Sequence, residues 1–380
     1  MPAVNACCVS NSSSRLAKLA KSATRIGVFA LLSALYIFPS AHAADKKQAK
    51  SSSEPVTCAT CHAGIAATYA HAPMRHAIEL PNANPPLETH PNLTTQLNGY
   101  TYTVVTKDGH TTYTVSDATG ASLSLPVRWM FGQHTQTWVL EKDGLLFESV
   151  VSYFPREQAL STTPGDQKLV PHTLMEAMGR PLSVWESRSC FNCHATDALT
   201  NGKLVLDKVR PGLDCVRCHL GSEQHMADAI HDNFKTLPKS LKKMPAEDIS
   251  NFCGQCHRTW DTVIRNQWHG RAFVRFQPYR LALSKCFIGN DPRISCLACH
   301  DPHQPVNHDQ AFYNGKCQAC HSEVHIASAT ASTATTAKVC PVSKTDCISC
   351  HMPKVELPGG HTIFTDHYIR VVKAGEPYPY

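Results

Sequence analysis

Alternation of apolar and polar positions marks one region of the chain as a β-sheet. Residues 100–120 and 137–154 are rich in β-branched and aromatic side chains. Each run is interrupted by an Asp-Gly pair, Asp108-Gly109 and Asp143-Gly144, which is typical of the two-residue turn of a hairpin. The pattern predicts an antiparallel β-meander from about residue 99 to 154, inside an insertion at residues 97–160.

Other parts of the chain show a helical spacing of apolar residues or none. Residues 221–234 and 244–268 have the helical period, with much irregular chain between such segments. Residues 81–96 are rich in Pro and Asn and predict a linker. Residues 326–338 are low in complexity, which is compatible with a surface helix or a loop.

The first 43 residues have the pattern of a secretory signal peptide. A basic segment precedes an apolar run at residues 26–38, and Ala41-His42-Ala43 is a small-residue cleavage site. An uncleaved anchor is the alternative, but about 13 apolar residues are short against the roughly 18 that a span needs. We expect cleavage near Ala43, a periplasmic or otherwise exported protein, and no integral membrane span afterwards.

Cysteine and histidine dominate the chemistry of this chain, with 18 Cys and 22 His in 380 residues. Seven C-x-x-C-H motifs account for most of the cysteines. Such a motif is the attachment signal of haem c, because two thiols three positions apart reach the two vinyl groups on one porphyrin edge and the adjacent His meets the iron. The cofactor-binding cysteines are Cys58, Cys61, Cys190, Cys193, Cys215, Cys218, Cys253, Cys256, Cys296, Cys299, Cys317, Cys320, Cys347 and Cys350. The proximal ligands of the seven covalently attached haems are His62, His194, His219, His257, His300, His321 and His351.

Two other interpretations of a cysteine-rich exported chain fit these motifs less well. Zinc sites also use C-x-x-C pairs, but zinc does not require a His directly after every second Cys. A disulfide scaffold explains neither the spacing nor the His. Cys286 and Cys340 lie outside the motifs, and an oxidising compartment makes a disulfide between them a hypothesis.

The histidines outside the motifs are candidates for the second axial position of each iron. Removing the seven motif histidines and His42 from the total leaves fourteen, enough for mainly bis-His haems. His225, His303 and His325 each follow a motif histidine closely, so each should reach the iron of a neighbouring haem rather than its own. We also select His71, His134 and His269, and we favour His71 over the nearby Met74 as a ligand.

The formal charge of +6 does not indicate a nucleic-acid partner. The leader removes four basic residues, and seven haems add roughly fourteen propionate carboxylates, so the mature protein should be acidic. The expected partners are redox proteins.

Several segments resemble the cytochrome c-554 type (cytochrome c-552/4 domain) of multihaem cytochromes, related to the haem module of tetratricopeptide-containing cytochromes. They are GLDCVRCHLGSEQH, SCLACHDPH and DCISCHMPKVELPGGHTIFTDHYIR, with CATCHAGIAATYAHAPM and the segment at 131–154. The resemblance implies periplasmic electron transfer and favours His225, His303, His361 and His367 as distal ligands. This chain has no helical-repeat tail and no C-x-x-C-K motif, and it has seven motifs where hydroxylamine-oxidising relatives typically have eight.

The predicted fold is a multihaem cytochrome c of the α+β class, with short helices and irregular loops packed around haems and a β-meander insertion. The expected parts are the signal peptide (1–43), a single-haem segment with linker (44–96), the insertion (97–160), a six-haem domain (161–370) and a tail (371–380). We favour an electron carrier with closely packed haems. The alternatives are an oxidoreductase that acts on a small nitrogen or sulfur compound at one haem with an open distal site, and a partner subunit of a larger respiratory complex.

Overall fold

The computed structural model describes residues 56–288, 293–322, 340–373 and 375–379. The expected signal peptide, the low-complexity stretch at 326–338 and His325 lie outside the described residues. Within the described ranges, no helix is both long and apolar enough to cross a membrane. Helices and an antiparallel sheet are both present, so the α+β class is confirmed.

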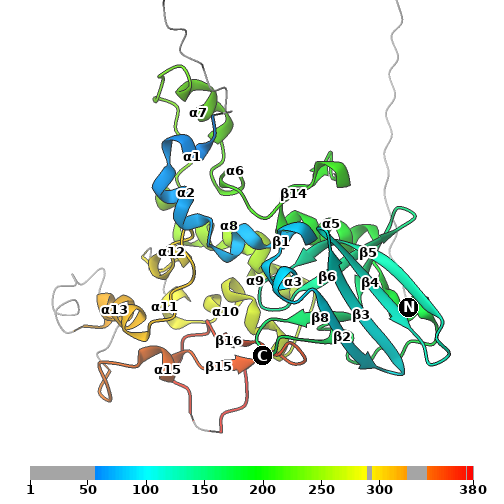
Figure 1. Cartoon of the computed structure of the whole chain (residues 1–380). Coiled ribbons are helices and arrows are strands. Elements are labelled where there is room, and N and C mark those ends of the chain that lie inside the picture. Colours follow the sequence, from blue (N-terminus) through cyan, green and yellow to red (C-terminus); the bar gives the residue numbers. More distant parts are fainter. Residues whose placement is uncertain (1–55, 289–292, 323–339, 374, 380) are drawn as a thin grey trace, which may run out of the picture. The chain divides into compact units, whose positions relative to one another are not determined.

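An antiparallel sheet forms one side of the described chain (Figure 1). Its strands are ordered β10-β7-β6-β5-β4-β3-β2, and β1 pairs with the second half of β5. A register shift between Val127 and Trp129 divides β5, so that its first half pairs with β4 and its second half with β6. The strands are β1 (Ile78–Glu79), β2 (Asn92–Leu97), β3 (Tyr100–Lys107), β4 (His110–Ser116), β5 (Ser122–Phe131), β6 (Thr137–Lys142), β7 (Leu145–Ser149) and β10 (Gly179–Pro181).

The hairpins predicted at the two Asp-Gly pairs are confirmed. Asp108 and Gly109, between β3 and β4, have φ of 52° and 74°, and Asp143 and Gly144, between β6 and β7, have φ of 52° and 76°. Positive φ at both positions gives a turn whose twist matches that of the strands. The sequence Asn98-Gly99 makes a third such turn between β2 and β3, which the sequence analysis did not use.

Residues 81–96 do not form the predicted linker. They contain a 3-10 turn η2 (Pro81–Ala83), the helix α3 (Pro85–Thr89) and most of strand β2. Asn84 accepts a hydrogen bond from the Leu87 amide at the start of α3, and the Leu87 side chain is fully buried in the core of the sheet. Pro and Asn act here as helix-start residues, which composition alone does not separate from a linker.

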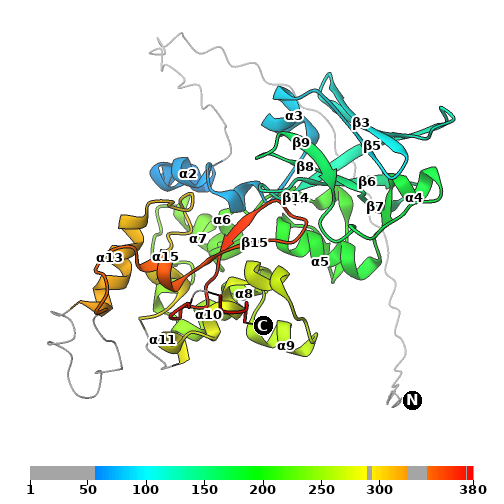
Figure 2. The same cartoon turned by 90° about the horizontal axis from the view of Figure 1, so that it is seen from below.

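Two apolar clusters fill the core. The larger one lies within the sheet and includes Tyr102, Tyr113 and Trp138. The smaller one joins the sheet to helix α5 (Val184–His194), because Phe191 of α5 meets Trp129 edge-on with ring centroids 5.1 Å apart. The view from below shows α5 beside the sheet (Figure 2). The sheet therefore fixes the helix that carries the second motif.

The rest of the described chain is made of short helices, which bear the other motifs. They are α1 (Cys58–Cys61), α2 (Ala63–Tyr69), α4 (Leu174–Met178), α6 (Cys215–Cys218), α7 (Ser222–Ala229), α8 (Ala246–His257), α9 (Trp260–Arg265), α10 (Gln277–Ala282), α11 (Lys285–Ile288), α12 (Cys296–Cys299), α13 (Gln310–His321) and α15 (Cys347–His351). The helical pattern at 221–234 corresponds to α7. The pattern at 244–268 corresponds to α8 and α9, which Arg258 separates with a φ of 64°.

Short 3-10 turns and two-stranded ribbons complete the secondary structure. The turns are η1 (Pro73–His76), η3 (Leu206–Lys208), η4 (Leu241–Lys243) and η5 (Arg271–Arg275). The ribbons pair β8 (Val151–Phe154) with β9 (Ala159–Thr162), β11 (Ala195–Asp197) with β14 (Arg210–Pro211), β12 (Leu199–Thr200) with β13 (Lys203–Leu204), and β15 (Lys354–Glu356) with β16 (Ile363–Thr365).

The start of α5 generates a prediction about acid stability. Glu186 closes a capping box with Ser183 and pairs with Arg180 at 2.6 Å, and the hydrogen bonds from Ser183, followed by Arg180, lower the pKa of Glu186 to about 2. This stabilisation is present above the ordinary carboxyl pKa and is lost as the pH falls toward 2.

We expect Glu186→Gln to lower the thermal unfolding midpoint by a few degrees at pH 7. The difference from the parent protein should disappear near pH 2, as measured by circular dichroism. Glu157→Gln, which removes an exposed carboxylate in the β8–β9 turn, is the control. A difference that persists at pH 2 would contradict the capping argument.

Candidate haem-binding sites

Each described C-x-x-C-H motif is held on a short helical turn. The two Cys of a motif are three positions apart, so their thiols lie on one face of the helix. In the third motif the side chain of Asp214 accepts a hydrogen bond from the Cys215 amide at 2.7 Å, which fixes where α6 begins. Two thiols and one imidazole are thereby presented together, as thioether attachment and axial ligation require.

Three of the motif histidines face a second imidazole. The ring centroids of His62 and His225 are 6.4 Å apart, with an angle of 39° between the rings. Those of His219 and His303 are 5.8 Å apart and nearly parallel, at 14°. A third pair is formed by His300 with His367, at 6.1 Å and 36°.

The spacing within these pairs fits a shared iron. A metal–imidazole bond of about 2 Å on each side, plus about 1 Å from the nitrogen to the ring centre, separates two axial imidazole centres by roughly 6 Å. The three observed separations lie close to this value. Each pair thus has the centroid separation that two imidazole ligands of one iron would need.

Hydrogen bonds orient the second imidazole of each pair. Nδ1 of His225 donates to the Thr236 carbonyl at 2.7 Å, and Nδ1 of His367 donates to the Thr365 carbonyl at 3.0 Å. Nδ1 of His303 donates to the carboxylate of Asp301 at 3.1 Å. Because Nδ1 carries the proton in each ring, Nε2 is left unprotonated and is the nitrogen that could bind a metal.

Burial keeps several of these imidazoles neutral. Desolvation, with a smaller contribution from His300, lowers the pKa of His367 to about 4. Desolvation also lowers the pKa of His219 and of His300, with contributions from neighbouring histidines. Only a neutral imidazole can donate its lone pair to a metal, so these rings are in the ligating state at pH 7.

Residues 156–220 match the family model described as cytochrome c554 and c-prime, a segment that contains the second and third motifs. This match covers 65 of the 380 residues and supports a cytochrome of the c554 type. It indicates a c-type cytochrome, a class of protein that holds haem c covalently and acts in electron transfer. No curated protein and no solved structure matches the chain.

In this cytochrome, each second histidine follows a different motif from the one that it faces. His225 comes shortly after the third motif but faces His62 of the first. His303 comes after the fifth motif and faces His219 of the third, and His367 comes after the seventh and faces His300 of the fifth. The rings of His225 and His303 therefore lie near the histidine of another motif rather than near that of the motif they follow.

The other predicted distal ligands lie elsewhere. His71, His134, His269 and His361 are all exposed. The His134 ring is 6.5 Å from that of Phe364, and the His361 ring is 4.9 Å from that of Phe154. Among the ring contacts of the described residues, none joins these four to a motif histidine.

Thiols of different motifs lie next to one another. The thiol of Cys256 donates a hydrogen bond to Cys193, which lowers the pKa of Cys193 to about 6. Similar contacts join Cys58 to Cys215 and Cys253 to Cys296. Cys317 and Cys347 form another such contact, and Cys299 lies near Cys320.

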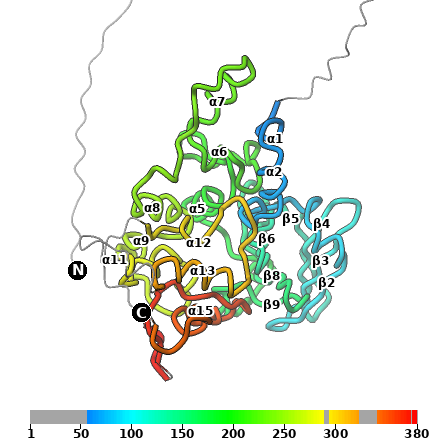
Figure 3. The backbone as a smooth tube through the Cα atoms, turned by 90° about the vertical axis from the view of Figure 1, so that its left-hand side faces the viewer, coloured from blue at the N-terminus to red at the C-terminus, as the bar shows by residue number. Residues whose placement is uncertain are grey.

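These contacts give the motifs an order in space. The first motif lies next to the third, because Cys58 contacts Cys215. The third lies next to the fourth, because Cys218 is near Cys253. The fourth motif lies next to the fifth, the fifth next to the sixth, and the sixth next to the seventh. The second motif also lies next to the fourth. The tube view shows α12, α13 and α15 in succession on one side of the described chain (Figure 3).

The hypothesis of a Cys286–Cys340 disulfide is wrong for this structure, in which no disulfide joins the two residues. Burial raises the pKa values of the motif thiols Cys299 and Cys317, and the nearby Cys286 adds a smaller contribution to both. Cys340 is an exposed thiol, and hydrogen bonds from the backbone of Ser343 and Val342 lower its pKa.

Sequence reasoning missed a buried ion pair between Arg280 and Asp366. Its two members are 86 residues apart, and both side chains are almost fully buried. The sequence shows only an Asp directly before His367, which does not reveal a partner so far along the chain.

Gly212, just before the third motif, generates a second prediction. Its φ is +70°, and a Cβ there would lie 1.9 Å from the Arg75 carbonyl oxygen. In the same place the Leu213 amide donates to the Met74 carbonyl at 3.0 Å. This contact holds the chain after the first motif against the chain before the third.

We expect Gly212→Ala to lower the thermal midpoint by several degrees, because the chain must move away from Arg75. The low-spin haem signals in the electron paramagnetic resonance spectrum should also change. Gly120→Ala is the matched control, since Gly120 has a φ of +87° but nothing within 4 Å of an added Cβ. Equal effects of the two variants would show that backbone strain alone, and not the contact with Arg75, is responsible.

Proposed function

We propose that the chain carries seven haems c, one at each motif, and passes electrons between redox partner proteins along the resulting row. The observation that supports this best is the set of three histidine pairs spaced as two axial ligands of one iron. The close approach of motif thiols supports a row of neighbouring haems, because each thiol would anchor a porphyrin edge.

Haem c supplies the iron that gains and loses an electron, and the residues of the chain do the rest. The motif cysteines fix where each haem is attached. The motif histidines His62, His219 and His300, with His225, His303 and His367, would hold the iron at three of the haems, and carbonyl acceptors fix the imidazole tautomers of His225 and His367. Bis-His ligation lowers the reduction potential relative to Met/His ligation, so we infer a low-potential carrier.

His71, His134, His269 and His361 are our candidates for distal ligands at other haems. Two of them lie where the chain after the seventh motif meets the sheet. Thr135, next to His134, donates from Oγ1 to the Gly360 carbonyl, next to His361, at 3.3 Å. The two segments are thus held together, and we propose that this junction serves the haems nearest the sheet.

The remaining parts of the proposal concern where the protein works. The signal-peptide pattern and the family, whose members are typically exported, support a periplasmic or otherwise exported carrier. We retain the division into an N-terminal single-haem segment, a β insertion and a six-haem domain. We also retain an acidic mature protein whose partners are redox proteins rather than nucleic acid.

The haem count gives a direct test. We expect the mass of the purified protein to exceed that of its mature polypeptide by seven haems, and a pyridine haemochrome assay to give the same count. Cys253→Ala combined with Cys256→Ala should remove one haem from the total. A count below seven in the parent protein would contradict the assignment of every motif.

The ligand pairs are tested by replacing one facing histidine. His225→Ala should convert one haem from low spin to high spin, because His62 would be left as the only protein ligand of its iron. His231→Ala, in the chain directly after α7, is the control and should change nothing. A parent protein that already contains a high-spin haem able to bind carbon monoxide or hydroxylamine would support the oxidoreductase alternative instead.

A further inference from the structure

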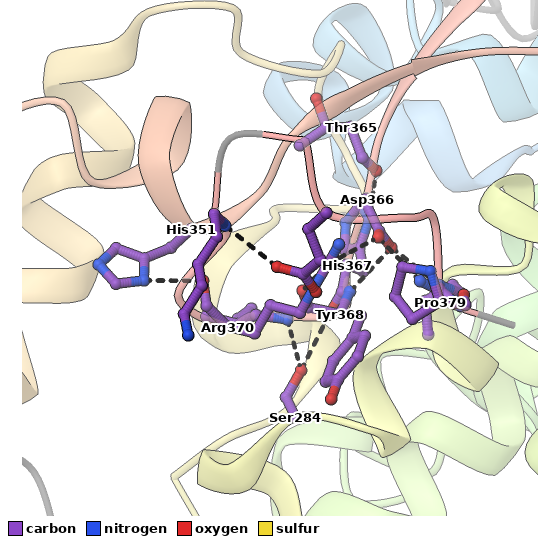
Figure 4. A network of polar contacts seen from close by, with 12 residues as sticks. Ser284, His351, Thr365, Asp366, His367, Tyr368, Arg370 and Pro379 are labelled. Carbon is purple, nitrogen blue, oxygen red and sulfur yellow. Dashed lines mark hydrogen bonds and ion pairs between the residues drawn. The ribbon is translucent and has the colours of Figure 1, made fainter.

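A buried cluster of charges lies beside the last haem-binding segments. Arg280 and Asp366 have 1% and 0% of their side chains exposed. The guanidinium of Arg280 makes a bidentate contact with the Asp366 carboxylate. The distances from Nε to Oδ1 and from Nη2 to Oδ2 are each 2.8 Å. Arg370 adds a second guanidinium, with Nη1 3.1 Å from Oδ2. The buried Asp366 carboxylate thus contacts two guanidinium groups, and Glu376 also pairs with Arg370, at 3.5 Å. Figure 4 shows Asp366 and Arg370 within this network.

The carboxylate of Asp366 also shapes the chain around it. Its Oδ1 accepts a hydrogen bond from the Tyr368 amide at 3.0 Å. The Asp366 amide donates to the Pro353 carbonyl at 2.9 Å, which ties the segment to the residues just after the seventh motif. Residues 366–370 are therefore folded around the buried ion pair.

One end of this segment presents His367. Oγ of Ser284 donates to the His367 carbonyl at 3.1 Å and accepts from the Ile369 amide at 2.8 Å. Ser284 follows helix α10, the same helix that carries Arg280. Two residues near one helix thus hold the backbone on either side of the imidazole that faces His300.

The other end of the segment holds His351, the histidine of the seventh motif. Nδ1 of His351 donates to the Arg370 carbonyl at 2.9 Å, and the Arg370 amide donates to the His351 carbonyl at 3.2 Å. The orientation of the His351 ring therefore depends on where the Arg370 backbone lies. That position is fixed in turn by the contact between Arg370 and Asp366.

The last residues of the chain complete the cluster. Nη1 of Arg280 donates to the Pro379 carbonyl at 2.9 Å. The Tyr378 ring centre lies 4.7 Å from the Arg280 guanidinium carbon, within range of a cation–π contact. The tail thereby accepts a hydrogen bond from Nη1 of Arg280, the guanidinium nitrogen that does not contact the Asp366 carboxylate.

We propose that Asp366 is a positioning residue shared by two haem sites, fixing His367 opposite His300 and His351 at the seventh motif. The inference rests on the proposed function, in which both histidines bind iron. It goes further by making two sites depend on one buried carboxylate. Because Asp366 is the anion between two guanidinium groups, removing its charge should raise the midpoint potentials of both haems, since the ferric state carries the larger positive charge.

The test uses Asp366→Asn in the full holoprotein, which keeps the shape of the side chain and removes its charge. Electron paramagnetic resonance combined with a redox titration should show altered signals and raised midpoint potentials at two of the seven haems. The other five should be unchanged. No change at any haem, or equal changes at all seven, would overturn the proposal.

A second variant covers the case in which Asp366→Asn fails to fold, because an unpaired buried arginine is strongly destabilising. Arg280→Lys keeps the positive charge but loses the bidentate contact with the Asp366 carboxylate. It should alter the signals of the same two haems by a smaller amount. Glu141→Gln is the control, since it breaks an ion pair with Arg128 at 3.0 Å in the sheet and should leave all seven potentials unchanged.

Failure of the positioning inference can be told apart from failure of the ligand assignment. His367→Ala should create one new high-spin haem if His367 is a ligand. If it creates none, the proposed ligation at the fifth motif is wrong. If it creates one while both Asp366→Asn and Arg280→Lys leave every potential unchanged, the ligation holds and only the shared positioning is wrong.

Discussion

The constraint on which this molecule depends is the placing of two thiols and an imidazole on one short helical turn. Four of the seven motif helices have only 4 or 5 residues, and the other three have 11 or 12. Helices of that length are not stable by themselves in water. Their stability must come from the segments around them and from what they hold, so the haems of the proposed cytochrome would contribute to its fold as well as to its chemistry.

The sheet has a different source of stability and a different role. Its core of Tyr, Trp and aliphatic side chains is of the ordinary apolar kind, and it contacts the motif region through Phe191 of α5. The carbonyl of Ala77, just before β1, also accepts a hydrogen bond from His194 at 2.7 Å. The sheet thus supports the second motif through Phe191 and His194.

The local features of this chain could be read from its sequence, whereas the long-range ones could not. The motif residues and the two Asp-Gly hairpins are defined by neighbours within a few positions. The burial of Leu87, the joining of Arg280 to Asp366 and the facing of His225 toward His62 depend on segments far apart along the chain. Composition and periodicity carry no information about contacts between distant segments. The linker predicted at residues 81–96 was therefore wrong, and the Arg280–Asp366 ion pair was not predicted.

The direction of the histidine pairs has a consequence for biogenesis. In all three pairs the facing histidine lies C-terminal to the motif that it faces. In the proposed exported cytochrome, a chain that emerges from its N-terminus first would present each of these motifs before the matching histidine. Under the proposed ligation, haem attachment could begin while the chain is still emerging, but the sixth bond at each of the three irons would wait for a later segment. Maturation of this cytochrome would accordingly finish at its C-terminal end.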